Sequence, residues 1–196
     1  MSGDERMARP PRPDGSTGLA PRDGHAPASS VRRIVVMGVS GAGKSTVGEA
    51  LAHRLDVPFI DADDLHPAVN VEKMRAGTPL TDDDRWPWLD LVGAALAEAS
   101  SPGVVVACSA LRRAYRDRLR AVAPDVVFIA LEGDPAVLAD RLGARAGHFM
   151  PATLLASQLA LYESPAADER AVHCAIEGPL DGIVTAAVAG VEALDW

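Results

Sequence analysis

Residues 34–51 of the chain read IVVMGVSGAGKSTVGEAL, and this stretch decides the fold. An apolar run of strand type gives way to glycines, a lysine and hydroxyl residues, and apolar residues then resume at helical spacing. Residues 38–45 match the pattern G-x-x-x-x-G-K-[ST] at every fixed position. The glycines let backbone N–H groups turn inward around an anion, and the following helix adds the positive end of its dipole. The stretch therefore predicts a phosphate-binding loop between a strand and a helix.

The fixed residues of this loop each have an expected task. Lys44 reaches the β and γ phosphates of a nucleotide as a point charge, and the Ser45 hydroxyl can bind Mg²⁺. The third predicted strand ends without the aspartate that often helps to hold this ion, whereas the second strand ends in Asp61, Asp63 and Asp64. We assign Mg²⁺ to Ser45 and Asp61. The residues expected to hold ATP are Gly38, Val39, Ser40, Gly41, Ala42, Gly43, Lys44, Ser45 and Thr46.

The rest of the chain alternates between short apolar runs and segments with helical periodicity. Continuous apolar strands alternating with helices are typical of a parallel sheet covered on both faces. We therefore expect an α/β fold, a three-layer sandwich with about five parallel strands. The predicted strands are 31–37, 57–61, 103–109, 125–131 and 171–176, and the predicted helices are 44–55, 67–76, 84–99, 111–122, 135–145, 151–163 and 180–194.

Composition divides the 196 residues into an extension and one domain. Residues 1–30 hold one leucine and no isoleucine, valine or aromatic residue, so we expect a disordered extension before a domain at 31–196. The net charge of −8 argues against nucleic acid or a membrane surface as partner. Two cysteines form no disulfide framework, and no run reaches membrane-spanning length, so we expect a cytoplasmic protein.

The second candidate site is the segment FIDADDLHPAVNVEKMRAGTPLTDDDRWPWL at 59–89. Ligands of open α/β sheets bind at the carboxyl ends of the strands, where Asp63 is expected. A carboxylate there can accept a hydrogen bond from an acceptor hydroxyl and orient it for in-line attack. Cationic residues in and after this segment indicate an acceptor that is itself an anion. The residues assigned to it are Asp63, His66, Lys73, Arg85, Arg112 and Arg116.

Several neighbours of these residues have simpler interpretations. The run Asp82–Asp84 is expected to be the solvated start of a helix, where dipole and capping suffice as reasons. Trp86 and Trp88 are expected to pack in the core or at its rim. Arg113, Arg118 and Arg120 are expected to form a solvent-exposed face.

Residues 141–151, RLGARAGHFMP, have the composition of a lid. Arg141 and Arg145 lie four residues apart, on one face of a helix, and a glycine and a proline follow. Arginines carried in by a closing lid stabilise charge on the transferred phosphoryl group and exclude water. The alternative is a surface helix with ordinary exposed arginines.

Four segments together resemble the gluconokinase family of small P-loop kinases: GVSGAGKST, DADDLHPAVNVEKMRAGTPLTDDDRWPWL, CSALRRAYRDRLR and RLGARAGHFMP. The resemblance implies ATP-dependent phosphorylation of D-gluconate to 6-phosphogluconate, a fold like those of adenylate and shikimate kinases, and a homodimer. Asp63, His66, Lys73 and Arg85 match positions of the family's acceptor segment. Lysine is common in the family where Arg112 stands, and residues 161–170, LYESPAADER, depart from the family's usual L-E-x-P-x-x-D-E segment.

These patterns lead to one mechanism and two alternatives. Gluconate places its carboxylate toward the cationic cluster and its terminal hydroxyl near Asp63, while Lys44, Mg²⁺ and Arg141 or Arg145 neutralise charge. One alternative is a kinase for another small hydroxy acid, such as shikimate. The other is a nucleotide-binding module without transfer activity. A GTPase is disfavoured because the chain lacks an N-K-x-D motif.

Overall fold

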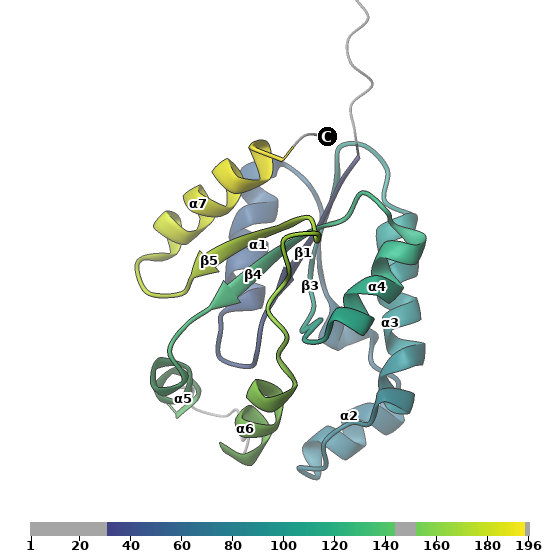
Figure 1. Cartoon of the computed structure of the whole chain (residues 1–196). Coiled ribbons are helices and arrows are strands. Elements are labelled where there is room, and N and C mark those ends of the chain that lie inside the picture. Colours follow the sequence, from purple (N-terminus) through teal and green to yellow (C-terminus); the bar gives the residue numbers. More distant parts are fainter. Residues whose placement is uncertain (1–30, 144–151, 195–196) are drawn as a thin grey trace, which may run out of the picture.

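The computed structural model describes residues 31–143 and 152–194, which form a sheet of five parallel strands with helices around it (Figure 1). The strand order is β2-β3-β1-β4-β5, so β1 lies at the centre and every neighbour is reached by a crossover. The pairs β2–β3, β3–β1, β1–β4 and β4–β5 are all parallel. The strands are β1 (Arg32–Met37), β2 (Phe59–Asp61), β3 (Gly103–Ala107), β4 (Val127–Glu132) and β5 (Ala171–Ala175).

Helices fill the crossovers and also gather at one end of the sheet. None of the helices that the structure describes is long and apolar enough to cross a membrane. The helices are α1 (Lys44–Leu55), the 3₁₀ turn η1 (Ala62–Leu65), α2 (Ala68–Arg75), α3 (Asp82–Ala97), α4 (Arg113–Val122), α5 (Pro135–Gly143), α6 (Ala152–Leu161) and α7 (Leu180–Glu192).

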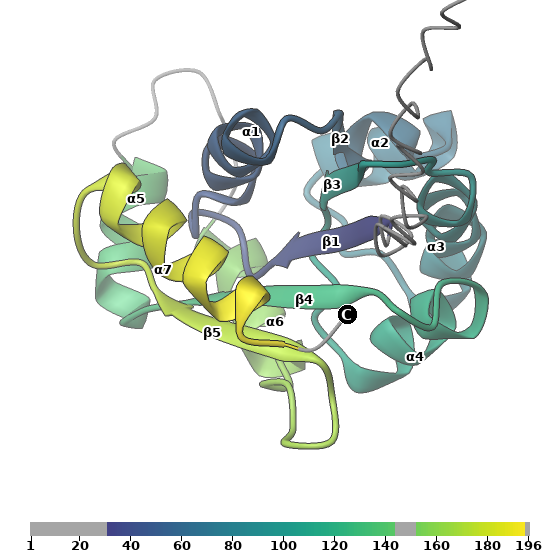
Figure 2. The ribbon, with the colours of Figure 1, turned by 90° about the horizontal axis from the view of Figure 1, so that it is seen from above.

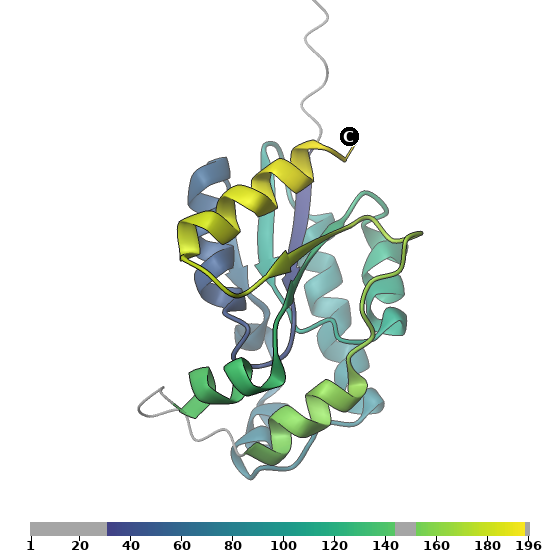
Figure 3. The ribbon, with the colours of Figure 1, turned by 60° about the vertical axis from the view of Figure 1, so that its left-hand side comes forward.

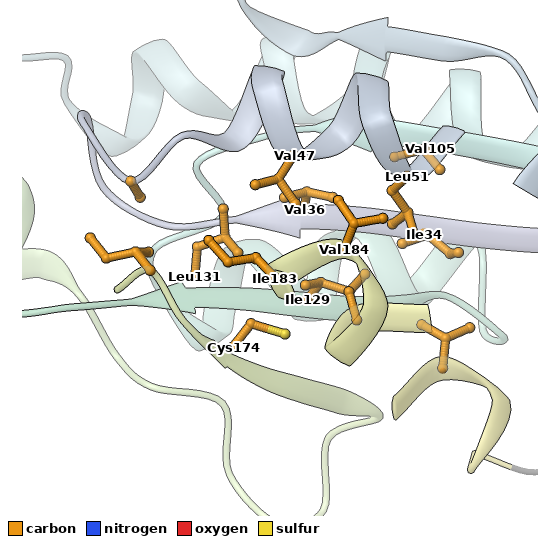
Figure 4. Packing of buried hydrophobic residues seen from close by; sticks show 14 of the residues in the cluster. Ile34, Val36, Val47, Leu51, Val105, Ile129, Leu131, Cys174, Ile183 and Val184 are labelled. Carbon is orange, nitrogen blue, oxygen red and sulfur yellow. The ribbon is translucent and has the colours of Figure 1, made fainter. Parts of the chain in front are cut away.

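The core consists of two apolar layers, one on each face of the sheet. Successive strand residues point to opposite faces, so Ile34 and Val36 belong to one layer and Val35 and Met37 to the other. Helices α1 and α7 cover the first layer, and α3 and α4 cover the second (Figure 2). Figure 4 shows the first layer, in which Val47 and Leu51 of α1 and Ile183 and Val184 of α7 pack on β1 and β4.

The carboxyl ends of the strands carry the segments that can bind ligands. Figure 1 places α2, α5 and α6 at this end of the sheet, and Figure 3 shows α5 and α6 there from a second side. The phosphate-binding loop leaves β1 at the same end. All candidate segments therefore meet at one edge, as expected for a parallel sheet.

The predicted fold class is confirmed, and the first residues of two helices differ from the prediction by two positions for local reasons. Helix α3 begins at Asp82, two residues earlier than predicted, because Thr81 and Asp84 form a reciprocal capping box. Helix α4 begins at Arg113 rather than 111, because Ala110 has a positive φ of 40° and the chain turns there. Residues 1–30, the predicted disordered extension, lie outside the described residues, as does Arg145.

Candidate active site

The phosphate-binding loop has the backbone that its glycines allow. Gly41 and Gly43 have φ of 85° and 92°, a region that favours glycine, and Gly43 directly precedes the first residue of α1. Gly38 lies so close to β4 that an added Cβ would stand 2.8 Å from the Leu131 carbonyl oxygen. Lys44 starts α1, and its Nζ donates to the Val39 carbonyl oxygen across the loop at 3.3 Å. The loop thus presents N–H groups and an ammonium to one concave space.

That space is an open cavity of about 730 Å³. It lies between the loop and the segment after β2, and its volume lies in the range of ligand pockets. Its lining includes five residues of the loop and α1 start, three carboxylates after β2, and Leu142 of α5. The lining residues are Ser40, Gly41, Gly43, Lys44, Ser45, Glu49, Phe59, Ile60, Asp61, Asp63, Asp64, Leu65 and Leu142.

Two oxygen ligands suited to Mg²⁺ meet in this cavity. Ser45 Oγ donates to Asp61 Oδ2 at 2.6 Å, and Asp61 Oδ1 accepts from the Asp63 backbone N–H at 3.0 Å. The second bond fixes the orientation of the Asp61 carboxylate. Among the described residues no group of three or more histidine, cysteine, aspartate or glutamate side chains could hold a metal. A hydroxyl and one carboxylate still fit Mg²⁺, which takes its remaining oxygens from water and phosphates.

A second, smaller cavity of about 80 Å³ adjoins the first. The two cavities share Ser40, Lys44 and Asp63, so the loop and this carboxylate stand between them. Among the described residues, Asp63 is the one carboxylate that lines the smaller cavity. The remaining lining residues are His66, Met74, Leu80, Arg85, Trp88, Ser109, Leu111, Ser157 and Gln158. One cavity therefore lies at the phosphate-binding loop, and the other lies beside the segment predicted to bind the acceptor.

His66 lies in the smaller cavity on an aromatic support. Its ring stacks on Trp88, with centroids 4.2 Å apart and planes inclined by 13°. Trp88 is buried and donates its indole N–H to the Ala62 carbonyl oxygen at 2.7 Å, which fixes the pair. Burial lowers the pKa of His66, and the charge of Arg85 lowers it further, against an opposite effect of Asp63. The predicted packing role of Trp88 is confirmed, and the stacking holds the His66 ring beside the smaller cavity.

Three of the predicted acceptor cations, Lys73, Arg85 and Arg112, lie near one another, but each is already paired with an aspartate. Lys73 Nζ donates to Asp84 Oδ1 at 2.6 Å, and Arg112 Nη1 donates to Asp82 Oδ2 at the same distance. Arg85 Nη1 lies 3.4 Å from Asp82 Oδ1. Arg85 lines the smaller cavity, whereas Lys73 and Arg112 are outside its lining. The run of aspartates is thus more than a solvated helix start, since two of its three carboxylates hold cations.

The three arginines of α4 that were expected to form a solvent-exposed face all make ion pairs. Arg113 pairs with Asp168, Arg118 with Asp90, and Arg120 with Asp117 and the buried Glu169. Trp86 packs edge-on against Tyr115 at a centroid distance of 5.5 Å, which confirms its packing role.

The assignment of Arg116 to substrate binding is wrong for this structure. Its side chain has no exposed area and makes a bidentate pair with Glu169, with Nε and Nη2 at 2.7 and 2.8 Å from the carboxylate oxygens. Its Nη1 donates to the carbonyl oxygens of Ala110, Leu111 and Glu163. No donor of the guanidinium points to either cavity. Arg116 instead fastens the segment after α6 to α4.

The two lid arginines have different outcomes. Arg141 lies near the end of α5 and donates from Nη2 to the Ile176 carbonyl oxygen at 2.8 Å, and it is not in the lining of either cavity. Its neighbour Leu142 does line the larger cavity. Arg145 lies outside the described residues. The role of both arginines in transfer therefore stays a prediction.

One contact in the site was missed at the level of sequence. The Gln158 side chain, on α6, accepts from the Ser40 backbone N–H at 2.7 Å, and it also lines the smaller cavity. Helix α6 therefore touches the phosphate-binding loop directly. The sequence signal for this contact was a single amide side chain, that of Gln158, within the apolar run LLASQLAL.

A central parallel sheet, a phosphate-binding loop before α1 and an adjoining acceptor cavity define a small-molecule kinase of the P-loop class. A family model described as an AAA domain matches residues 34–165. A gluconokinase of Gluconobacter oxydans is 46% identical over 84% of this chain and 93% of its own. The thermoresistant gluconokinase of Escherichia coli is 46% identical over 79% and 90%. The crystal structure of a gluconokinase from Sinorhizobium meliloti superposes with a TM-score of 0.77, at 52% identity over 83% of this chain and 92% of that one.

The chain belongs to the gluconokinase family. The AAA-domain match at residues 34–165 includes every residue that lines the two cavities.

Proposed function

We propose that the protein transfers the γ-phosphoryl group of ATP to a hydroxyl of D-gluconate, giving 6-phosphogluconate and ADP. The observation that carries the proposal is the pair of adjoining cavities, which meet at Ser40, Lys44 and Asp63. Membership of the gluconokinase family supplies the acceptor. The cationic and hydrogen-bonding lining of the smaller cavity suits a small hydroxylated anion.

Residues of the loop hold the nucleotide in this proposal. Backbone N–H groups of the loop and of the first residues of α1 bind the phosphates, and Lys44 neutralises charge between the β and γ positions. Ser45 and Asp61 hold Mg²⁺, which when bound supplies further positive charge to the phosphates. Asp63 holds Asp61 in place through its backbone N–H.

Asp63 has the second task of orienting the acceptor. Its carboxylate reaches the smaller cavity, where it accepts a hydrogen bond from the reacting hydroxyl and can take its proton. Arg85 binds the carboxylate of the acid, and His66 forms hydrogen bonds with its hydroxyl groups. Lys73 and Arg112 lie outside the lining of this cavity, and their charges are balanced by Asp84 and Asp82.

The test is ADP release with Mg-ATP and four conditions: D-gluconate, shikimate, AMP and no acceptor. Release that depends on gluconate is expected. Release only with shikimate would keep the transfer mechanism and replace the acceptor. ATP binding without acceptor-dependent release would support the alternative of a nucleotide-binding module and overturn the proposal. The homodimer and the cytoplasmic location stay predictions. Light scattering on the purified protein tests whether it is a homodimer.

A further inference from the structure

The carboxylate of Asp82 lies within reach of three donors, from α3, from α4 and from the residue before α4. Asp82 is the first residue of α3, and its Oδ2 accepts from Arg112 Nη1 at 2.6 Å. Its Oδ1 accepts a short hydrogen bond from the Tyr115 hydroxyl of α4 and lies 3.4 Å from Arg85 Nη1. Arg85 Nη1 in turn lies 3.2 Å from the Tyr115 oxygen. One carboxylate thus ties together two of the cations assigned to the acceptor.

These contacts hold Arg85 by one end only. Its side chain is 13% exposed and lines the smaller cavity beside Asp63 and His66. Asp82 and Tyr115 both engage Nη1, and the structure gives Nε and Nη2 no partner among the residues it describes. A guanidinium fixed in this way keeps an Nε–Nη2 edge for a bidentate bond to a carboxylate.

The chemistry of the cluster agrees with a fixed, ionised Asp82. The hydrogen bond from Tyr115 lowers the pKa of Asp82, and the charges of Arg112 and Arg85 lower it further, against a raising effect of burial. Burial and the same hydrogen bond raise the pKa of Tyr115, so its hydroxyl remains a donor. The Tyr115 ring is buried and also lies within 6 Å of both guanidinium carbons, at 5.6 and 5.7 Å.

We propose that Asp82 is a positioning residue for the acceptor: through Tyr115 it holds Arg85 in the orientation that binds the carboxylate of the sugar acid. The inference rests on the proposed function, because it requires an anionic acceptor. Asp83, the next residue, serves as a comparison because its carboxylate lies at the same helix start but makes none of these contacts. It is exposed and has no ion pair or side-chain hydrogen bond within the described part of the chain.

The test compares Asp82→Asn with the matched control Asp83→Asn. Each removes one negative charge from the same helix start, and that loss alone would strengthen the binding of an anion. Loss of positioning should weaken the binding of gluconate, because Arg85 would no longer be held in place and would have to be ordered when the acceptor binds. We expect Asp82→Asn to raise the KM for gluconate about tenfold, with the KM for ATP within about twofold. Asp83→Asn should leave both constants unchanged or lower the KM for gluconate.

A second variant keeps the test decisive if Asp82→Asn folds poorly. Tyr115→Phe removes the hydroxyl between Asp82 and Arg85 but keeps the buried ring, and it should raise the KM for gluconate while leaving that for ATP unchanged. The inference is overturned if both variants bind gluconate as the unmodified protein does, or if the two KM values rise together. A wild-type protein without gluconate-dependent ADP release would instead remove the proposed function itself.

Discussion

Replacing Glu169 by glutamine should destabilise the protein strongly without changing how it binds gluconate. The carboxylate accepts from Arg116 Nε and Nη2, from Arg120 Nη1 at 2.7 Å and from the Ala166 backbone N–H at 3.1 Å. Its side chain has no exposed area. Glutamine has nearly the same shape, but it removes the charge and turns an amide N–H₂ group toward a buried guanidinium.

Two routes give the magnitude of this effect. Breaking a buried ion pair by removing one partner costs about 3–5 kcal/mol. Burial raises the pKa of Glu169, but hydrogen bonds from Arg116, the Ala166 N–H and Arg120 together lower it from 4.5 to about 2. That fall corresponds to about 3 kcal/mol. For a domain of this size a loss of about 3 kcal/mol lowers the Tm by about 10 °C.

Thermal and urea unfolding at several pH values provide the assay. The pKa of Glu169 is lower in the folded state, so its stabilisation is complete above pH 4.5 and is lost as the pH falls toward 2. The gap between wild type and Glu169→Gln should therefore be widest at neutral pH and shrink between pH 4.5 and 2. Aspartates such as Asp84, whose pKa is held at about 2 by Lys73 and Thr81, change both proteins equally.

Measuring the KM for gluconate distinguishes a structural role of Arg116 from the substrate-binding role that the sequence indicated. At a temperature where Glu169→Gln is folded, its KM for gluconate should equal that of the wild type. A difference below about 1 kcal/mol at pH 7, or a raised KM for gluconate with unchanged stability, would refute the reasoning and return Arg116 to the acceptor site.

Three further predictions concern the site and the packing beside it. Asp63→Asn should lower kcat about 100-fold or more while changing the KM for ATP little, and near-normal turnover would remove Asp63 from the mechanism. Ser45→Ala should raise the Mg²⁺ concentration needed for half-maximal activity, with no change in the KM for gluconate; equal Mg²⁺ curves would contradict the assignment. Gly190→Ala should cost about 1–3 kcal/mol, because the added Cβ would lie 2.3 Å from Val172 Cγ1. Gly182→Ala in the same helix has 3.6 Å of space and serves as its control in thermal unfolding.

The local patterns predicted the elements because each element depends on its own residues. Apolar β-branched runs such as residues 104–106 are buried on both faces of the sheet, and the loop at 38–45 follows from a fixed spacing of glycines. The order of the strands could not be predicted in this way, since it depends on crossovers between distant segments.

What the sequence did not reveal is the pairing of charges across helices. Arg116 and Glu169 are 53 residues apart, and nothing in the helical pattern of α4 distinguishes this buried arginine from its exposed neighbours. In the same way, Asp82–Asp84 has the composition of a helix start, and only the packing of α3 against α4 brings Arg112 and Tyr115 to Asp82. The capping box at Thr81 and Asp84, by contrast, was a local signal.

The wall shared by the two cavities has a consequence for inhibitor chemistry. Because Ser40, Lys44 and Asp63 line both spaces, the two cavities adjoin at these residues. A bisubstrate compound, with a nucleoside polyphosphate joined through its last phosphate to the terminal oxygen of a sugar acid, would need only a short tether to reach both. The second half would then bind at a high effective concentration, and translational freedom would be lost once rather than twice. Selectivity among kinases would come from the sugar-acid half, since the phosphate half meets a loop common to the whole class.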